Sequence, residues 1–176
     1  VDNERWKGVP FYMRTGKRMS KKESSIVISF KEVPCTTFQD GIKKLQPNKL
    51  TINIQPEMDI NLSFMTKKPG LDMKLKPAEM VFDYFECAPD TPEAYETLLL
   101  DALDGDSTLF MRSDQVEEAW DVIANIQTAW ENGNVSKMVT YPAGSSGPEA
   151  ADELLKRQGH NWLSNSNETL KTKKDA

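Results

Sequence analysis

The feature that most constrains the fold is a change of hydrophobic period near residue 88. In residues 49–55 and 60–66, apolar side chains alternate with polar ones, which is typical of β-strands with one buried face. Beyond residue 91, apolar side chains recur every three or four positions, which is typical of amphipathic helices. Strands followed by helices predict the α+β class, here a large, mostly antiparallel sheet with helices packed on one face.

The first half of the chain predicts at least six strands before residue 87. Besides the two alternating segments, the candidates are residues 9–16, 24–30, 71–76 and 80–86. We expect residues 9–16 and 24–30 to form a hairpin whose tip is the basic segment 14–23. Because most links between these strands are short, the pairing should be antiparallel. Apolar residues on both faces of 24–30 and 80–86 indicate that the open face of the sheet meets a partner.

Three helices are predicted in the second half. Thr91 is a typical N-cap residue and Pro92 a typical first helical residue, while Ser113 is the expected N-cap of the second helix. Glycines end all three segments, as they commonly end helices. The predicted helical segments are residues 92–105, 113–133 and 147–159.

Charge and composition argue against several classes of function. The formal net charge is −5, whereas nucleic-acid-binding domains usually present a basic face. No apolar run approaches the roughly 20 residues that span a bilayer, and the N-terminus has no apolar signal-peptide core. Cys35 and Cys87 are expected to be reduced thiols, and a single His leaves too few ligands for a zinc site. We therefore expect a cytoplasmic protein without metal, membrane or nucleic-acid partners.

The chain also lacks a recognisable catalytic residue. There is no glycine-rich phosphate loop and no nucleophile elbow. His160 is expected at a helix end, and Glu117 and Glu118 on an exposed helix face. The basic segment 14–23 is either a solvated turn or an anion-binding site. Together these features indicate a partial site rather than a complete active site.

Five segments together resemble the C-terminal domain of the glucose-6-phosphate dehydrogenase family. They are, in chain order, ERWKGVPFYMRTGKRM, NKLTINIQP, MTKKPG, PEAYETLLLDALDGDSTLFMRSDQVEEAW and YPAGSSGPEAADELLKRQGHNW. The resemblance implies one domain over residues 1–163, followed by a polar, disordered tail over residues 164–176. The Rossmann half of that family has no counterpart in this sequence.

The resemblance implies an oxidation of glucose 6-phosphate to 6-phosphogluconolactone with NADP, in the oxidative pentose phosphate pathway. In the family, a His removes the proton of the C1 hydroxyl while hydride leaves for the nicotinamide. That His and most of the NADP site belong to the Rossmann half, and His160 does not match its motif. The chain alone is therefore expected to be inactive, and the family fold implies a homodimer through the sheet. The sequence leaves open NAD against NADP preference and dimer against tetramer.

Three substrate positions are carried over from the family motifs. Lys17, in RTGKRM, matches the lysine that contacts the sugar phosphate, and Lys22 matches a second substrate position that is Lys or Arg. Gln55, in INIQP, matches a glutamine near the substrate in some members. A phosphate dianion favours ammonium groups, because charge-assisted hydrogen bonds are the stronger ones.

Animal members of the family hold a second, structural NADP in this domain through basic and aromatic side chains. In this sequence Arg14 alone keeps a matching basic group. The other corresponding positions are Val27, Asn53, Asn61, Ser63, Val81 and Ser146. Without cations for the 2′-phosphate, this site should be absent or very weak, as in a protein of the bacterial type.

Two other interpretations remain at this point. The chain could be a non-catalytic dimerisation or regulatory module with the same fold, or a generic anion-binding domain. The first predicts that neutral substitutions at Lys17 and Lys22 are harmless. The second predicts that glucose 6-phosphate and sulfate bind equally well.

Overall fold

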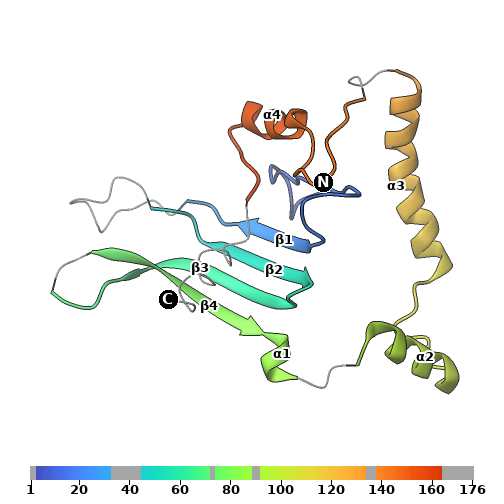
Figure 1. The fold of residues 1–176 in the computed structure, drawn as a ribbon, viewed down its shortest axis with the longest axis horizontal. Helices are drawn as coiled ribbons and strands as arrows, with labels where there is room; N and C mark the ends of the chain where they lie inside the picture. The colour runs from blue at the N-terminus through green and yellow to red at the C-terminus, as the bar shows by residue number, and fades with distance from the viewer. Residues whose placement is uncertain (1–2, 33–44, 72–73, 89–91, 134–137, 164–176) are drawn as a thin grey trace.

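The protein forms one antiparallel sheet, accompanied by helices at its margins (Figure 1). The computed structural model describes residues 3–32, 45–71, 74–88, 92–133 and 138–163. The strands are β1 (Ser24–Ser29), β2 (Lys49–Gln55), β3 (Asp59–Lys67) and β4 (Leu75–Asp83). They lie in the order β1-β2-β3-β4, so each strand pairs with its neighbour in the sequence. The helices α1 (Tyr84–Cys87), α2 (Ala94–Asp104), α3 (Ser113–Glu131) and α4 (Glu149–Arg157) follow, which confirms the α+β class.

The register of the strands gathers the apolar side chains on one face of the sheet. Leu50 pairs with Leu62 and Ile52 with Ile60, and the neighbouring strands continue these rows. The continuing residues are Ile26 and Ile28 on β1, and Met80 and Phe82 on β4. Because side chains alternate across a strand, all of these residues share a face.

This apolar face is open, whereas the centre of the polar face, on β2 and β3, is buried. Met80 is 62% exposed and Ile26 49%, while Thr51 and Asn61 on the opposite face are 1% and 2% exposed. The alternation along β2 and β3 was therefore identified correctly, but the apolar side is not the covered one. An uncovered apolar sheet surface of this kind marks an interaction site.

The buried polar face is held together by Asp59. One carboxylate oxygen, Asp59 Oδ1, accepts hydrogen bonds from the side-chain amides of Asn53 at 2.6 Å and Asn61 at 2.7 Å. Asn53 and Asp59 are directly opposite each other in the β2–β3 register. Buried amide groups need such partners. The three side chains therefore favour this register over a slipped one.

The predicted hairpin between residues 9–16 and 24–30 is wrong. Residues 9–15 are extended but belong to no strand, and β1 pairs with β2 instead. The segment that was expected to be the hairpin tip forms hydrogen bonds with residues 141–147, far along the chain. A local turn signal at Gly16 was thus overridden by a long-range contact.

The prediction of at least six strands is also wrong, since the described residues contain four. The candidates 71–76 and 80–86 overlap a single strand, β4, and residues 72 and 73 lie outside the described part. β4 ends early because the Asp83 side chain accepts hydrogen bonds from the backbone N–H groups of Phe85 and Glu86. This is an N-cap, and it starts the short helix α1.

The three longer helices lie close to their predicted positions. α2 begins at Ala94 rather than at Pro92, and the predicted N-cap Thr91 is outside the described residues. Gly105 ends α2 in the left-handed conformation, with φ 74°. In the turn that follows, the hydroxyl and the backbone N–H of Thr108 donate to Asp106 and lower the pKa of that carboxyl group.

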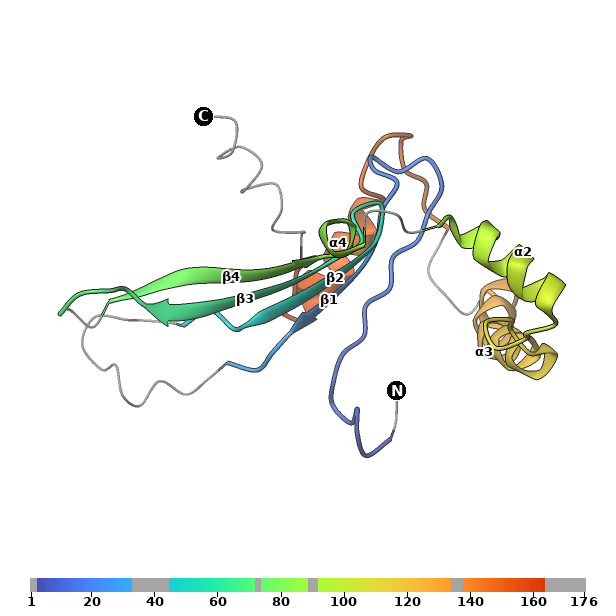
Figure 2. The ribbon, with the colours of Figure 1, turned by 90° about the horizontal axis from the view of Figure 1, so that it is seen from below.

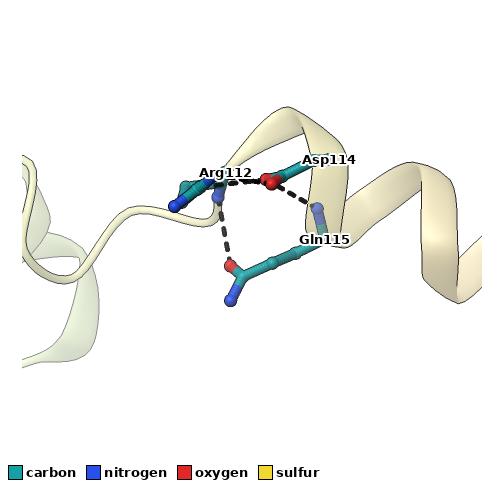
Figure 3. Close-up of polar contacts among 3 residues, drawn as sticks. All are labelled: Arg112, Asp114 and Gln115. Atoms are coloured by element: carbon teal, nitrogen blue, oxygen red, sulfur yellow. Dashed lines mark hydrogen bonds and ion pairs between the residues drawn. The ribbon is translucent and has the colours of Figure 1, made fainter.

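The N-terminus of α3 shows why its start was missed by one residue (Figure 3). Ser113 is the first helical residue, and Arg112 is the N-cap. The Gln115 side chain accepts from the Arg112 backbone N–H at 3.2 Å. Asp114 pairs with the Arg112 guanidinium at 2.6 Å and accepts from the Gln115 N–H at 3.0 Å. A carboxylate in the first turn also suits the positive end of the helix dipole.

α2 and α3 lie beyond one end of the sheet, and α4 lies near the β1 edge (Figures 1 and 2). The apolar faces that predicted these helices are largely exposed in α2 and α3. Leu99 is 65% exposed, Trp120 60% and Trp130 63%. On α4, by contrast, Leu155 is 1% exposed. Among the described residues, α4 therefore packs against the rest of the protein. The apolar faces of α2 and α3 are available to other surfaces.

We predict that Asp59→Ala lowers the free energy of unfolding by about 2–4 kcal/mol, because two buried amide groups lose their charged acceptor. Urea unfolding of the protein that carries this chain measures the change. Asp121→Ala, at an exposed position on α3, is the matched control and should change stability by under about 0.5 kcal/mol. Equal effects of the two substitutions would contradict the role given to Asp59.

Candidate functional site

The candidate site is built from two segments far apart in the sequence. We call residues 14–23 the basic loop and residues 141–147 the glycine loop. The Tyr141 hydroxyl donates to the Lys17 carbonyl at 2.8 Å, and the Gly144 N–H donates to the Arg18 carbonyl at 2.8 Å. The Ser20 N–H donates to the Ser145 carbonyl at 3.0 Å. These three contacts fasten the backbone of the basic loop around Lys17.

The close approach of the two loops depends on their glycines and on one strained residue. A Cβ atom at Gly16 would lie 2.6 Å from the Tyr141 hydroxyl oxygen, so only glycine fits there. Arg18 has φ 57°, an uncommon left-handed conformation for a residue with a side chain. Gly147 has φ 113°, which a residue with a side chain rarely adopts. Gly16, Arg18 and Gly147 thus adopt backbone conformations that bring the two loops together around Lys17.

Lys17 and Lys22 are exposed, and neither side chain forms a hydrogen bond or ion pair with any residue that the structure describes. Their ammonium groups are therefore available to a ligand. Lys22 lies two residues before β1, and Gln55 pairs with Ser24 at the first position of that strand. The sheet thus brings the exposed residue Gln55 close to the segment that carries Lys22. A polar group near the segment that carries Lys22 suits an anionic, hydroxyl-rich ligand.

Arg14 is placed differently from the two lysines. Its guanidinium group lies over the ring of Trp162, 4.4 Å from the centroid, and donates to the Ser146 carbonyl at 3.1 Å. It therefore links the basic loop to the glycine loop and to Trp162, in the segment after α4. Its charge is partly satisfied by these contacts.

Beside Arg14 there is an open cavity of about 550 Å³. Residues 11–15 form one wall, and α4 with Trp162 forms another. The sequence did not predict this cavity, because its walls come from segments that no local pattern connects. The hydroxyl of Tyr12 donates to Gln158 at 2.5 Å at its margin.

The residues expected to be without a catalytic role have ordinary surroundings. His160 is exposed, and its ring lies 5.5 Å from that of Tyr12. Glu117 and Glu118 are exposed on α3. In the described part of the chain, no three His, Cys, Asp or Glu side chains are placed to hold a metal ion.

Cys87 is a free, exposed thiol, and Cys35 lies outside the described residues, as does the tail 164–176. No helix in the described ranges is long and apolar enough to span a membrane.

Comparison with known proteins gives the family. Residues 1–163 match the family described as "Glucose-6-phosphate dehydrogenase, C-terminal domain". The chain belongs to this family. A glucose-6-phosphate 1-dehydrogenase of Mycolicibacterium smegmatis is 44% identical over 163 residues, which is 92% of this chain and 33% of that protein. A relative of the same name from Zymomonas mobilis is 43% identical over 167 residues. The chain thus spans about a third of the length of these relatives.

Solved structures agree with this assignment. A glucose-6-phosphate dehydrogenase described as "in complex with its substrate glucose-6-phosphate" superposes with a TM-score of 0.76 and 32% identity. The superposition covers 93% of this chain and 34% of that one. The glucose-6-phosphate 1-dehydrogenase of Mycobacterium avium superposes with a TM-score of 0.69 and 28% identity. The resemblance inferred from the sequence is therefore confirmed at the level of the family.

Sequence reasoning proposed Lys17, Lys22 and Gln55 as substrate positions, which stays a prediction, and did not name Tyr141. This tyrosine lies in a segment, YPAGSSGP, that contributed to the family resemblance. Its contact with Lys17 joins positions 124 residues apart. Such a contact leaves no periodic signal in a single sequence, and the only hint was the dense cluster of glycines and serines after it.

Proposed function

We propose that this chain is the substrate-binding and dimerisation domain of a glucose-6-phosphate 1-dehydrogenase. The full enzyme oxidises glucose 6-phosphate to 6-phosphogluconolactone: C1 loses hydride to NADP⁺, and the C1 hydroxyl loses its proton to a base. The observation that carries the proposal is the match over residues 1–163, within which the side chains of Lys17 and Lys22 have no partner among the described residues. Both substrate and coenzyme are metabolites of the cell interior, so we propose a cytoplasmic enzyme.

In this proposal Lys17 and Lys22 bind the substrate's phosphate group, and Gln55 contacts the sugar. Both lysines are exposed and have no competing partner among the residues described. An ammonium group and a phosphate dianion form short, charge-assisted hydrogen bonds. The base and most of the coenzyme site are assigned to the two-thirds of the relatives that this chain does not span. No residue of this chain is given a catalytic role.

The alternative is a non-catalytic module with the same fold. It would use the sheet for dimerisation and would have no need for free lysines on a shaped loop. The two proposals therefore differ most clearly at Lys17.

We predict that Lys17→Ala in the full-length protein raises KM for glucose 6-phosphate at least about tenfold, because charged hydrogen bonds to the phosphate are lost. Steady-state kinetics with varied glucose 6-phosphate measures this change. Lys31→Ala is the matched control, since Lys31 is also exposed but lies beyond the other end of β1. An unchanged KM in the Lys17 variant would favour the non-catalytic module.

We also propose that the apolar face of the sheet is the dimer interface. Ile26, Ile28, Met80 and Phe82 are each 42–62% exposed on that face. A stable dimer commonly buries about 1,200–2,000 Å² or more, and an extended four-stranded apolar surface suits such an interface. A two-fold symmetric dimer places the same surface of both copies in contact, and the apolar face of the sheet would serve as that surface.

We predict that Met80→Glu converts the dimer to a monomer, because it introduces a charge into an apolar interface. Light scattering after size exclusion gives the mass directly. Leu71→Glu is the control, since Leu71 is fully exposed outside the sheet and should leave the dimer intact. A dimeric Met80 variant with unchanged dissociation would exclude this face as the interface.

The structural NADP site of animal relatives is proposed to be absent. Arg14 is the one basic group at the corresponding positions, and it is engaged by Trp162 and Ser146. Val27 and Val81 occupy two further positions and offer no donor to a phosphate.

We predict that calorimetric titration of this chain with NADP gives no binding tighter than about 1 mM, which corresponds to about −4 kcal/mol. A chain from an animal relative, titrated in the same buffer, is the positive control. Saturable binding at micromolar NADP would overturn this proposal without affecting the assignment of the substrate site.

A further inference from the structure

We propose that Tyr141 is a positioning residue for Lys17: its hydroxyl fixes the backbone from which the Lys17 ammonium group reaches a phosphate dianion. The inference rests on the proposed function for the identity of the ligand. The contact itself rests on geometry alone. Tyr141 does not touch the substrate in this proposal, and its effect passes through Lys17.

The contact is a direct hydrogen bond to the residue concerned. The Tyr141 hydroxyl lies 2.8 Å from the carbonyl oxygen of Lys17, a good distance for an O–H donor. Tyr141 is partly buried, whereas Lys17 is exposed. The tyrosine is therefore the more fixed partner of the pair.

Gly16 gives the second, independent observation. A Cβ atom built on Gly16 would lie 2.6 Å from the Tyr141 hydroxyl oxygen, closer than Cβ atoms approach other heavy atoms. The tyrosine hydroxyl thus lies close to the backbone just before Lys17. The residue preceding the proposed phosphate ligand is shaped to receive this hydroxyl group.

The physical need for positioning comes from the lysine side chain. Lysine has a flexible four-carbon chain, and ordering it on binding opposes affinity. If the backbone also had to be ordered, its conformational entropy would be added to that loss. Because the Lys17 carbonyl is fixed before the ligand arrives, binding does not have to order the backbone of Lys17, and only the side chain loses conformational entropy.

Of the three contacts around Lys17, the one from Tyr141 is made by a side chain and the other two are made by the backbone. The Gly144–Arg18 and Ser20–Ser145 bonds use backbone groups on both sides. Substitution leaves those bonds in place, so removing one hydroxyl group tests the position of Lys17 without dismantling the loop. Arg14 links the same two loops by its own side chain, but it lies three residues before Lys17.

The first experiment is Tyr141→Phe in the full-length protein. We expect KM for glucose 6-phosphate to rise about three- to tenfold, the effect of losing one neutral hydrogen bond. We expect kcat and the coenzyme KM to change less than about twofold, because ground-state binding is lost rather than chemistry. Tyr95→Phe, which removes a hydroxyl group from a 79% exposed tyrosine on α2, is the matched control.

A double-mutant cycle separates positioning from a general structural role. If Tyr141 acts through Lys17, Tyr141→Phe adds less than about twofold to KM once Lys17→Ala is present. If the two residues act independently, their effects multiply, and that result would overturn the inference. Equal melting temperatures of the single variants exclude loss of folding as the cause.

Gly16→Ala provides a second test that does not depend on the first. The new methyl group meets the Tyr141 hydroxyl oxygen, so this variant should raise KM for glucose 6-phosphate in the wild-type background. In the Tyr141→Phe background the oxygen is absent, so Gly16→Ala should raise KM for glucose 6-phosphate by a smaller factor. An equal rise of KM in both backgrounds would contradict the contact.

The outcomes distinguish this inference from the proposed function. Absence of glucose 6-phosphate oxidation by the unmodified full-length protein would refute the proposed function, and with it the role of Lys17. Normal oxidation with an unchanged KM in Tyr141→Phe would refute the positioning role alone.

Discussion

The antiparallel register of β2 against β3 is the constraint on which the rest of the structure depends. It pairs Leu50 with Leu62 and Ile52 with Ile60, and it sends every intervening polar residue to the opposite face. A shift by one residue would exchange the two faces. Asp59, which accepts from Asn53 and Asn61, opposes such a shift. The open apolar face is therefore a consequence of register and not of a loosely packed sheet.

This register also determines what the domain needs from its surroundings. The apolar residues of the sheet and those of α2 and α3 point to surfaces that the described residues do not cover, as their exposed fractions show. The chain spans about a third of its relatives, so both a second copy and the remaining two-thirds of the polypeptide are available to cover them. In the proposed dimer the second copy covers the sheet, since a two-fold axis would place the same extended surface of both copies against each other. The helices, which lie beyond the end of the sheet, are left for the remainder of the polypeptide (Figure 2).

The sequence predicted the elements whose signals are local. β2 was predicted at its observed bounds, β3 within one residue, and α4 within two residues at either end, because their side chains repeat at a fixed period. Residues 9–16 also show a loose alternation of apolar and polar residues, but they form no strand. Hydrogen bonds between the basic loop and the glycine loop hold the end of this segment instead. The second candidate for β4 ran past its observed end, because the cap formed by Asp83 could not be distinguished from a continuing strand. The lysines were found through family motifs, whereas their surroundings were not, because Tyr141 is 124 positions from Lys17.

The separation of these two positions has a consequence for how substrate affinity can vary in this domain. Lys17 is attached to the sheet by only a few residues, yet the hydrogen bonds that hold its backbone come from the segment that leads into α4. A substitution in α4 or in the glycine loop can therefore move Lys17, the residue proposed to bind the phosphate, without touching the substrate. In the proposed reaction the hydride leaves C1, whereas Lys17 contacts the 6-phosphate. Such substitutions should thus act mainly on binding, so the C-terminal helix and the basic loop form one functional unit.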